Sequence, residues 1–205
     1  MTTDAVATSA QLHLALDPEA DALLARDPFA LLVGMLLDQQ VPMERAFAGP
    51  RTLAERLGTP DRLDPVSIAA HDPQDFAALM AKPPAVHRFP GSMAGRVQAL
   101  AATVSATYDA DAASLWKASG SGEELLSRLR ALPGFGDQKA RIFVALLGKQ
   151  LGVRPRGWRE AAGSYGEEGS RRSVADVVDQ ASLAEVRSYK QQLKRAAKES
   201  GQAPT

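Results

Sequence analysis

The residues best placed to do chemistry form a glycine-containing turn in the second half of the chain. The turn consists of Leu132, Pro133, Gly134, Phe135 and Gly136. Gly134 and Gly136 permit backbone dihedral angles that are closed to other residues, and they let the backbone approach a ligand closely. A helix that begins after the turn presents free N–H groups at its positive end, where an anion is stabilised. Lys139 in its first turn adds a positive charge, so the pattern predicts a phosphate-binding site.

Two amphipathic helices must hold this turn in place. They are predicted at 123–130 and about 137–151, which makes 123–151 a helix-hairpin-helix. Leu132, Pro133 and Phe135 are expected to pack the two helices together. The alternative is a C-cap glycine followed by an ordinary turn.

The rest of the chain is predicted to be helical as well. Hydrophobic residues make up 45% of it and aromatic residues 5%, and this Ala- and Leu-rich composition gives a sheet little to pack. We expect a disordered segment 1–10 and one helical domain over 11–205, in which 11–16 is a short strand or an extended arm. Within that domain we expect a buried helix at 29–39, a basic Gly/Arg-rich loop at 152–172 and a final helix at 182–199.

The charges are distributed unevenly along the chain, although the net charge is +0. Residues 1–138 hold 11 Lys/Arg and 17 Asp/Glu, whereas residues 139–205 hold 13 Lys/Arg and 7 Asp/Glu. An acidic body with a basic end is compatible with one surface that faces DNA. Solvated helix faces would give the same distribution.

Several classes of site are excluded by composition. The chain has no cysteine, so it has no disulfide, no thiol nucleophile and no cysteine-ligated iron–sulfur cluster. Its three histidines are scattered without metal-ligand spacing, and we expect no metal site. No apolar stretch approaches the roughly 20 residues that span a bilayer, and residues 1–10 do not have the pattern of a secretory signal. We therefore expect a cytoplasmic protein.

Three segments of the chain resemble the HhH-GPD superfamily of base-excision-repair DNA glycosylases. They are DPFALLVGMLLDQQVP at 27–42, FPGSMAGRVQALAATV at 89–104, and the hairpin with LPGFG. Their order and spacing match the family over residues 27–152. The resemblance implies an all-α fold of two helical lobes flanking a cleft, and a monomer that binds double-stranded DNA. It also implies a Na⁺ or K⁺ ion at the hairpin when DNA is bound.

The resemblance also suggests roles for single residues. Gln40 falls where a polar side chain fills the gap left by an extruded base, although a plain helix C-terminus is the alternative. The lysine nucleophile of bifunctional members falls on Gln138, so no lyase activity is expected. Lys139 lies one residue later, about 100° around the helix, and should point elsewhere.

The family's catalytic aspartate has no counterpart at its own position, which falls on Arg156, Gly157 and Trp158. The catalytic acid is therefore expected to be Glu160 or Asp176, both of which have a solvated or helix-start acid as the alternative. Arg156 and Trp158 combine a cation with an aromatic ring, which suits contact with DNA. Trp158 can equally anchor the loop on the core.

These features lead to three hypotheses about function. The first is a monofunctional DNA glycosylase that removes a damaged or modified base, which it must swing out of the helix to reach. The second is a non-catalytic DNA-binding or damage-sensing protein that has lost the acid. The third is a helical scaffold that binds a protein or small ligand in the former base pocket.

Overall fold

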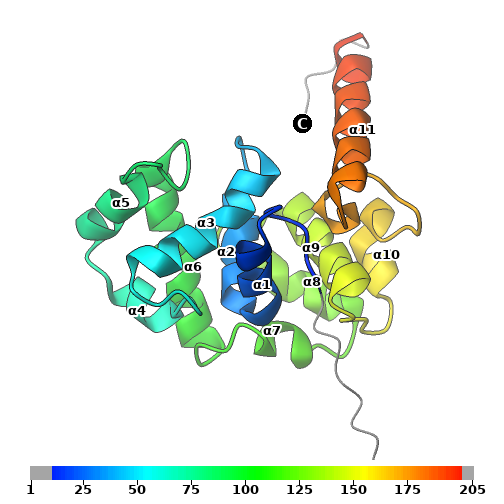
Figure 1. Ribbon diagram of the computed structural model, residues 1–205. Helices are drawn as coiled ribbons and strands as arrows, with labels where there is room; N and C mark the ends of the chain where they lie inside the picture. The colour runs from blue at the N-terminus through cyan, green and yellow to red at the C-terminus, as the bar shows by residue number, and fades with distance from the viewer. Residues whose placement is uncertain (1–10, 200–205) are drawn as a thin grey trace, which may run out of the picture.

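The computed structural model describes residues 11–199 and contains helices joined by short turns (Figure 1). The expected disordered segment 1–10 lies outside the described residues. The α-helices are α1 Pro18–Arg26, α2 Pro28–Leu37, α3 Met43–Arg56, α4 Pro65–Ala70, α5 Pro73–Ala81, α6 Pro90–Thr107, α7 Ser114–Lys117, α8 Gly122–Arg130, α9 Asp137–Gln150, α10 Trp158–Ala162 and α11 Gln180–Glu199. Two short 3₁₀ helices follow α10: η1 Gly163–Tyr165 and η2 Val174–Asp176. The all-α prediction is confirmed.

Asp-Pro pairs start four of the helices. In α1, α2, α4 and α5 the aspartate is the N-cap, its carboxylate accepts hydrogen bonds from backbone N–H groups of the first turn, and proline follows it. The proline sets a helical φ where no N–H is needed. Asp27 also accepts from the N–H of Leu63 at 2.6 Å, which fixes the start of α2 to the chain before α4.

The helices form two groups with α1 and α2 between them (Figure 1). The helices α4, α5 and α6 lie on one side of α2, and α8, α9 and α10 on the other, while α11 rises from the body at one corner. One continuous core of buried side chains runs from Leu12 to Ala175. Within α2 every residue from Phe29 to Leu37 is buried, as expected for a helix that both groups pack against.

The hairpin is formed by α8 and α9. Leu132 and Phe135 are buried between them, and the Phe135 ring meets Phe143 edge to face with centroids 5.8 Å apart, while Pro133 is half-buried. Gly134 has φ +81°, and a Cβ there would overlap Leu36 Cδ1. Gly136 differs from our expectation, because its φ of −69° is open to other residues.

One loop prediction is wrong, and the structure decides between two alternatives at another segment. The segment 152–172 is not a continuous loop, because it contains α10 and η1. Trp158 is buried against Gly148 of α9, where a Cβ would collide with the indole, and this tertiary contact holds α10 on the core. Residues 11–16 form an arm without a strand, which bends at 14–16, and the Asp21 carboxylate accepts hydrogen bonds from the N–H groups of Leu14 and Ala15 at 2.8 Å.

We predict that Gly134→Ala will lower the free energy of unfolding by about 2 kcal/mol or more. An alanine at this position would have to adopt a left-handed backbone conformation, which costs free energy, and its Cβ would overlap Leu36. Gly136→Ala is the matched control, since its added methyl would have nothing within 4 Å. Urea titrations should show a lower midpoint for Gly134→Ala alone, and equal midpoints would contradict the close approach.

Candidate functional site

A cleft of about 550 Å³ opens where the α2–α3 turn, the start of α9 and the side of α11 meet. It is lined by Met35, Asp38, Gln39, Gln40, Val41, Pro42, Gln138, Lys139, Ile142, Tyr165, Arg172, Lys190 and Lys194. Among these described residues four side chains are cationic, and one, Asp38, is acidic. The cleft is therefore a positively charged hollow that contains a single carboxylate.

The α2–α3 turn is held in place by contacts to Gln39. The Nε2 of His87 lies 2.8 Å from the Gln39 carbonyl oxygen, and Arg96 donates to Gln39 Oε1 at 3.0 Å. His87 is buried, and its Nδ1 accepts the N–H of Phe89, so the ring carries its proton on Nε2. These contacts tie the turn to α6 and the loop before it, and they leave Asp38 and Gln40 to face the cleft.

Gln40 has the backbone strain that is common at functional sites. Its φ is +58°, in the left-handed region that side chains other than glycine rarely adopt, and its side chain is exposed at the mouth of the cleft. The structure places Gln40 among the exposed residues that line the cleft, and its expected role of filling the gap left by an extruded base remains a prediction.

Asp38 is the functional candidate that our sequence analysis missed. Its carboxylate accepts no hydrogen bond and forms no ion pair with any residue of 11–199, and only the longer-range charges of Lys190, Lys139 and Glu44 act on it. Burial raises the pKa of Asp38 above its ordinary value, and Lys190 and Lys139 offset part of that rise. Asp38 also caps the C-terminus of α2, where the helix dipole disfavours a negative charge. An unpartnered carboxylate in a hollow is typical of a catalytic group.

Lys139 makes contacts different from the phosphate contact that we expected. Its Nζ donates to the carbonyl oxygens of Met35 at 2.7 Å and Leu36 at 3.1 Å, at the end of α2. Burial lowers the pKa of Lys139 to about 8. Lys139 and Gln138 both line the cleft despite their different directions on α9, because α2 approaches the start of α9 closely. Gln138 donates to the Tyr165 hydroxyl at 2.9 Å.

The two acids expected from the sequence lie outside the residues that line this cleft. Glu160 is exposed in the first turn of α10. The Asp176 carboxylate is buried and already engaged, because it accepts from Lys149 Nζ at 2.6 Å, from Ser170 Oγ at 2.9 Å and from backbone N–H groups at the start of η2. The other two positions from that segment, exposed Arg156 and buried Trp158, do not line the cleft either.

The hairpin presents its anion-binding features beside the cleft. Gly136 is the N-cap of α9 and has no side chain to occupy the first N–H groups of the helix. Asp137 in the same turn is neutralised by ion pairs with Arg130 and with Arg141, whose Nε donates at 2.9 Å. No side chain therefore caps the first N–H groups of α9, and the binding of an anion there remains a prediction.

Comparison with known protein families settles the relationship. The family model described as HhH-GPD superfamily base excision DNA repair protein matches residues 33–203. The chain belongs to the HhH-GPD superfamily. No curated protein and no solved structure matches it.

Membership makes this HhH-GPD protein a base excision DNA repair protein, and its partner is DNA. The match covers the hairpin, the α2–α3 turn and α11, so all the walls of the cleft belong to the family domain. Within residues 11–199, no helix has the length and apolar character needed to cross a membrane.

We predict that Asp38→Asn will stabilise the protein at pH 7. The folded-state pKa of Asp38 is raised, so its charge costs stability at neutral pH, and an uncharged amide of the same shape removes that cost. Urea unfolding should give a higher midpoint for the variant. The difference should shrink as the pH falls through the raised pKa towards that of an ordinary aspartate, because the wild type then becomes protonated.

Asp176→Asn provides the opposite control. Removing this charge leaves the ammonium of Lys149 without its partner at a buried position, which costs about 3 kcal/mol or more in comparable pairs. If Asp38→Asn were destabilised like Asp176→Asn, Asp38 would have to be a structural residue.

Proposed function

We propose that this protein is a monofunctional DNA glycosylase that removes a damaged or modified base from duplex DNA, with Asp38 as its catalytic carboxylate. The observation that supports the proposal is the single unpartnered carboxylate inside a cationic cleft beside the hairpin. A binding surface alone would not require it, because a half-buried carboxylate at a helix C-terminus weakens both folding and the attraction of phosphate.

The hairpin would hold the DNA backbone. The N–H groups at the start of α9 would bind one phosphate, and Gly136 would allow the backbone to approach it. The carbonyl oxygens of Pro133 and Gly134 accept no hydrogen bond from the described part of the chain, and so fit a Na⁺ or K⁺ ion facing that phosphate. Such an ion would supply positive charge next to the phosphate and takes no part in base removal.

The cleft would receive the extruded nucleotide. A volume of about 550 Å³ falls within the range of sites that hold small molecules. Ile142 and the ring of Tyr165 offer walls against which a base can pack, and the Gln138–Tyr165 hydrogen bond fixes the ring. Gln40 at the mouth would fill the space that the base leaves in the duplex.

Asp38 would act on the sugar. As the bond between C1′ and the base nitrogen breaks, its electron pair leaves with the base, and C1′ becomes positively charged. The Asp38 carboxylate would stabilise this charge and take a proton from the water that attacks C1′. Asp38 would then release this proton to solvent, and the departing base anion would take up a proton from solvent, so the products are a free base and an abasic sugar. A unit charge at about 4 Å is worth about 4 kcal/mol at a protein surface, which is enough for a large rate effect.

A non-catalytic DNA-binding protein is the second candidate. It is favoured by the place of Glu160 and Asp176 outside the cleft, and by the lack of an acid at the family position near Arg156. Incubation of the protein with a panel of duplexes that carry damaged bases distinguishes the two. Abasic sites in the products support the glycosylase, and binding without excision across the panel supports the second candidate.

We predict that Asp38→Asn will lose at least about a hundredfold in single-turnover excision while it binds the same duplex at least as tightly as the wild type, because the one negative charge in the cationic cleft is removed. This is the usual scale for deletion of one electrostatic stabiliser. The wild-type rate should fall at acidic pH through the raised pKa of Asp38, because the protonated acid cannot stabilise a cation. The rate of Asp38→Asn should lack this acid limb.

Two further variants test the acids expected from the sequence. Glu160→Gln should excise at the wild-type rate, and Asp176→Asn should excise normally at temperatures where it remains folded. A hundredfold loss in Glu160→Gln, with Asp38→Asn fully active, would return the catalytic role to the 152–172 segment.

We also predict that borohydride will trap no covalent complex with a duplex that contains an abasic site. Trapping requires a lysine amine that condenses with the C1′ aldehyde and releases water, and Gln138 stands at the family's lysine position. Lys139 is held by the two carbonyl oxygens of α2. A trapped complex that disappears in Lys139→Met would show that its amine leaves those oxygens and reaches the sugar.

A further inference from the structure

The outer half of α11 is a helix that stands clear of the body (Figure 1). Its base is anchored by Leu183 and Val186, which pack with Val177 and Met43. From 190 to 196 every side chain is exposed, including Leu193 at 53%. Its last turns therefore gain no stability from tertiary packing, which is the main support of helices this short in water.

Beyond Glu185 the helix α11 is strongly basic. Between Glu185 and Glu199 it contains no acid and five cations, Arg187, Lys190, Lys194, Arg195 and Lys198. Lys190 and Lys194 are four residues apart, so they share one face and repel each other. Within the described residues neither forms an ion pair, whereas Arg187 at the base pairs with Glu44 at 2.6 Å. An anionic partner would relieve this repulsion.

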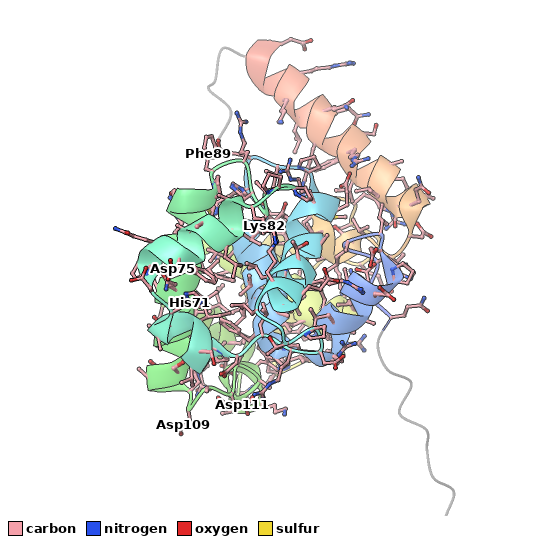
Figure 2. The ribbon with its side chains drawn as sticks, turned by 60° about the vertical axis from the view of Figure 1, so that its left-hand side comes forward. His71, Asp75, Lys82, Phe89, Asp109 and Asp111 are labelled. Carbon is pink, nitrogen blue, oxygen red and sulfur yellow. The ribbon has the colours of Figure 1, made fainter. Side chains whose placement is uncertain are left out.

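The position of Lys190 and Lys194 indicates which anionic partner they bind. Both line the cleft with Asp38 and Gln40, so their face of α11 is turned towards the site rather than towards a separate surface. The opposite end of the molecule carries exposed Asp109 and Asp111, far from α11 (Figure 2). A polyanion is therefore drawn to the end of the molecule where the cleft and α11 lie.

We propose that Lys190 and Lys194 bind phosphates of duplex DNA and form a second backbone anchor on a different wall of the cleft from the hairpin. The two lysines are about 6 Å apart along the helix axis, so they can contact successive parts of one strand. The hairpin and α11 together would hold the backbone on both sides of the nucleotide that leaves the stack. The inference depends on the proposed function for its ligand, which is DNA.

The test compares the salt dependence of binding between charge variants. Lys190→Gln/Lys194→Gln removes both cations and keeps good helix formers. Arg62→Gln/Lys117→Gln is the matched control, because it removes two exposed cations that do not line the cleft. Binding to an undamaged fluorescent duplex is measured by anisotropy over a series of salt concentrations, and circular dichroism compares helix content.

We expect the slope of log K against log salt to fall by about 2 in the α11 variant, since each lost phosphate contact removes about 0.9. The control should keep the wild-type slope. Equal slopes in wild type and α11 variant, or equal losses in variant and control, would overturn the inference. The proposed function is judged separately, because a wild type that binds but never excises contradicts the glycosylase and still allows the slopes to be compared. A wild type that binds no duplex would overturn both.

Discussion

The carbonyl oxygens at the end of α2 are bound by the ammonium group of Lys139, and the site depends on this contact. The last carbonyls of a helix have no partner within the helix and carry partial negative charge. A cation there donates hydrogen bonds to these oxygens and also interacts favourably with the helix dipole. The donor distances are 2.7 and 3.1 Å, and Gly134 lets the hairpin come close enough to Leu36 to make them possible. The contact brings the start of α9 beside the α2–α3 turn, and a cleft lies at this junction.

The turn is fixed from the other side by Gln39. His87 binds its carbonyl oxygen and Arg96 its side chain, so this residue is held by the helix group that contains α6. On either side of this fixed residue, Asp38 lines the cleft together with its four cations, and Gln40 has a left-handed backbone conformation. Positions of this kind have a cost in stability, which is expected where function rather than folding determines the residue.

Local signals in the sequence were sufficient to predict the helices, the hairpin and the family. Asp-Pro pairs and glycines mark helix ends, and the LPGFG turn has a local geometric meaning. The features that were missed are tertiary. The helix α10 forms within a Gly- and Arg-rich segment because Trp158 packs against Gly148, and Lys139 is withdrawn from solvent because the end of α2 arrives beside it. Asp38 could have been noticed as an acid next to Gln39 and Gln40. Its lack of hydrogen-bond and ion-pair partners, and its proximity to Lys190, which is far away in the sequence, arise only in the folded structure.

The packing of the second half of the chain explains why the carboxylate of the cleft, Asp38, lies at the end of α2. At the family's aspartate position the backbone anchors α10, since Trp158 is buried there, and an acid in its place would lose that packing. An acid at the end of α2 reaches the cleft without disturbing the hairpin, but it lies at the unfavourable end of a helix. Lys139 and Lys190 offset part of this cost by lowering the pKa that burial raises. The ammonium of Lys190 would therefore have two effects, since it favours the charged form of Asp38 against burial and, in our proposal, binds phosphate. A bound phosphate would compete for that ammonium and weaken its hold on Asp38, which couples DNA binding to the charge of the acid.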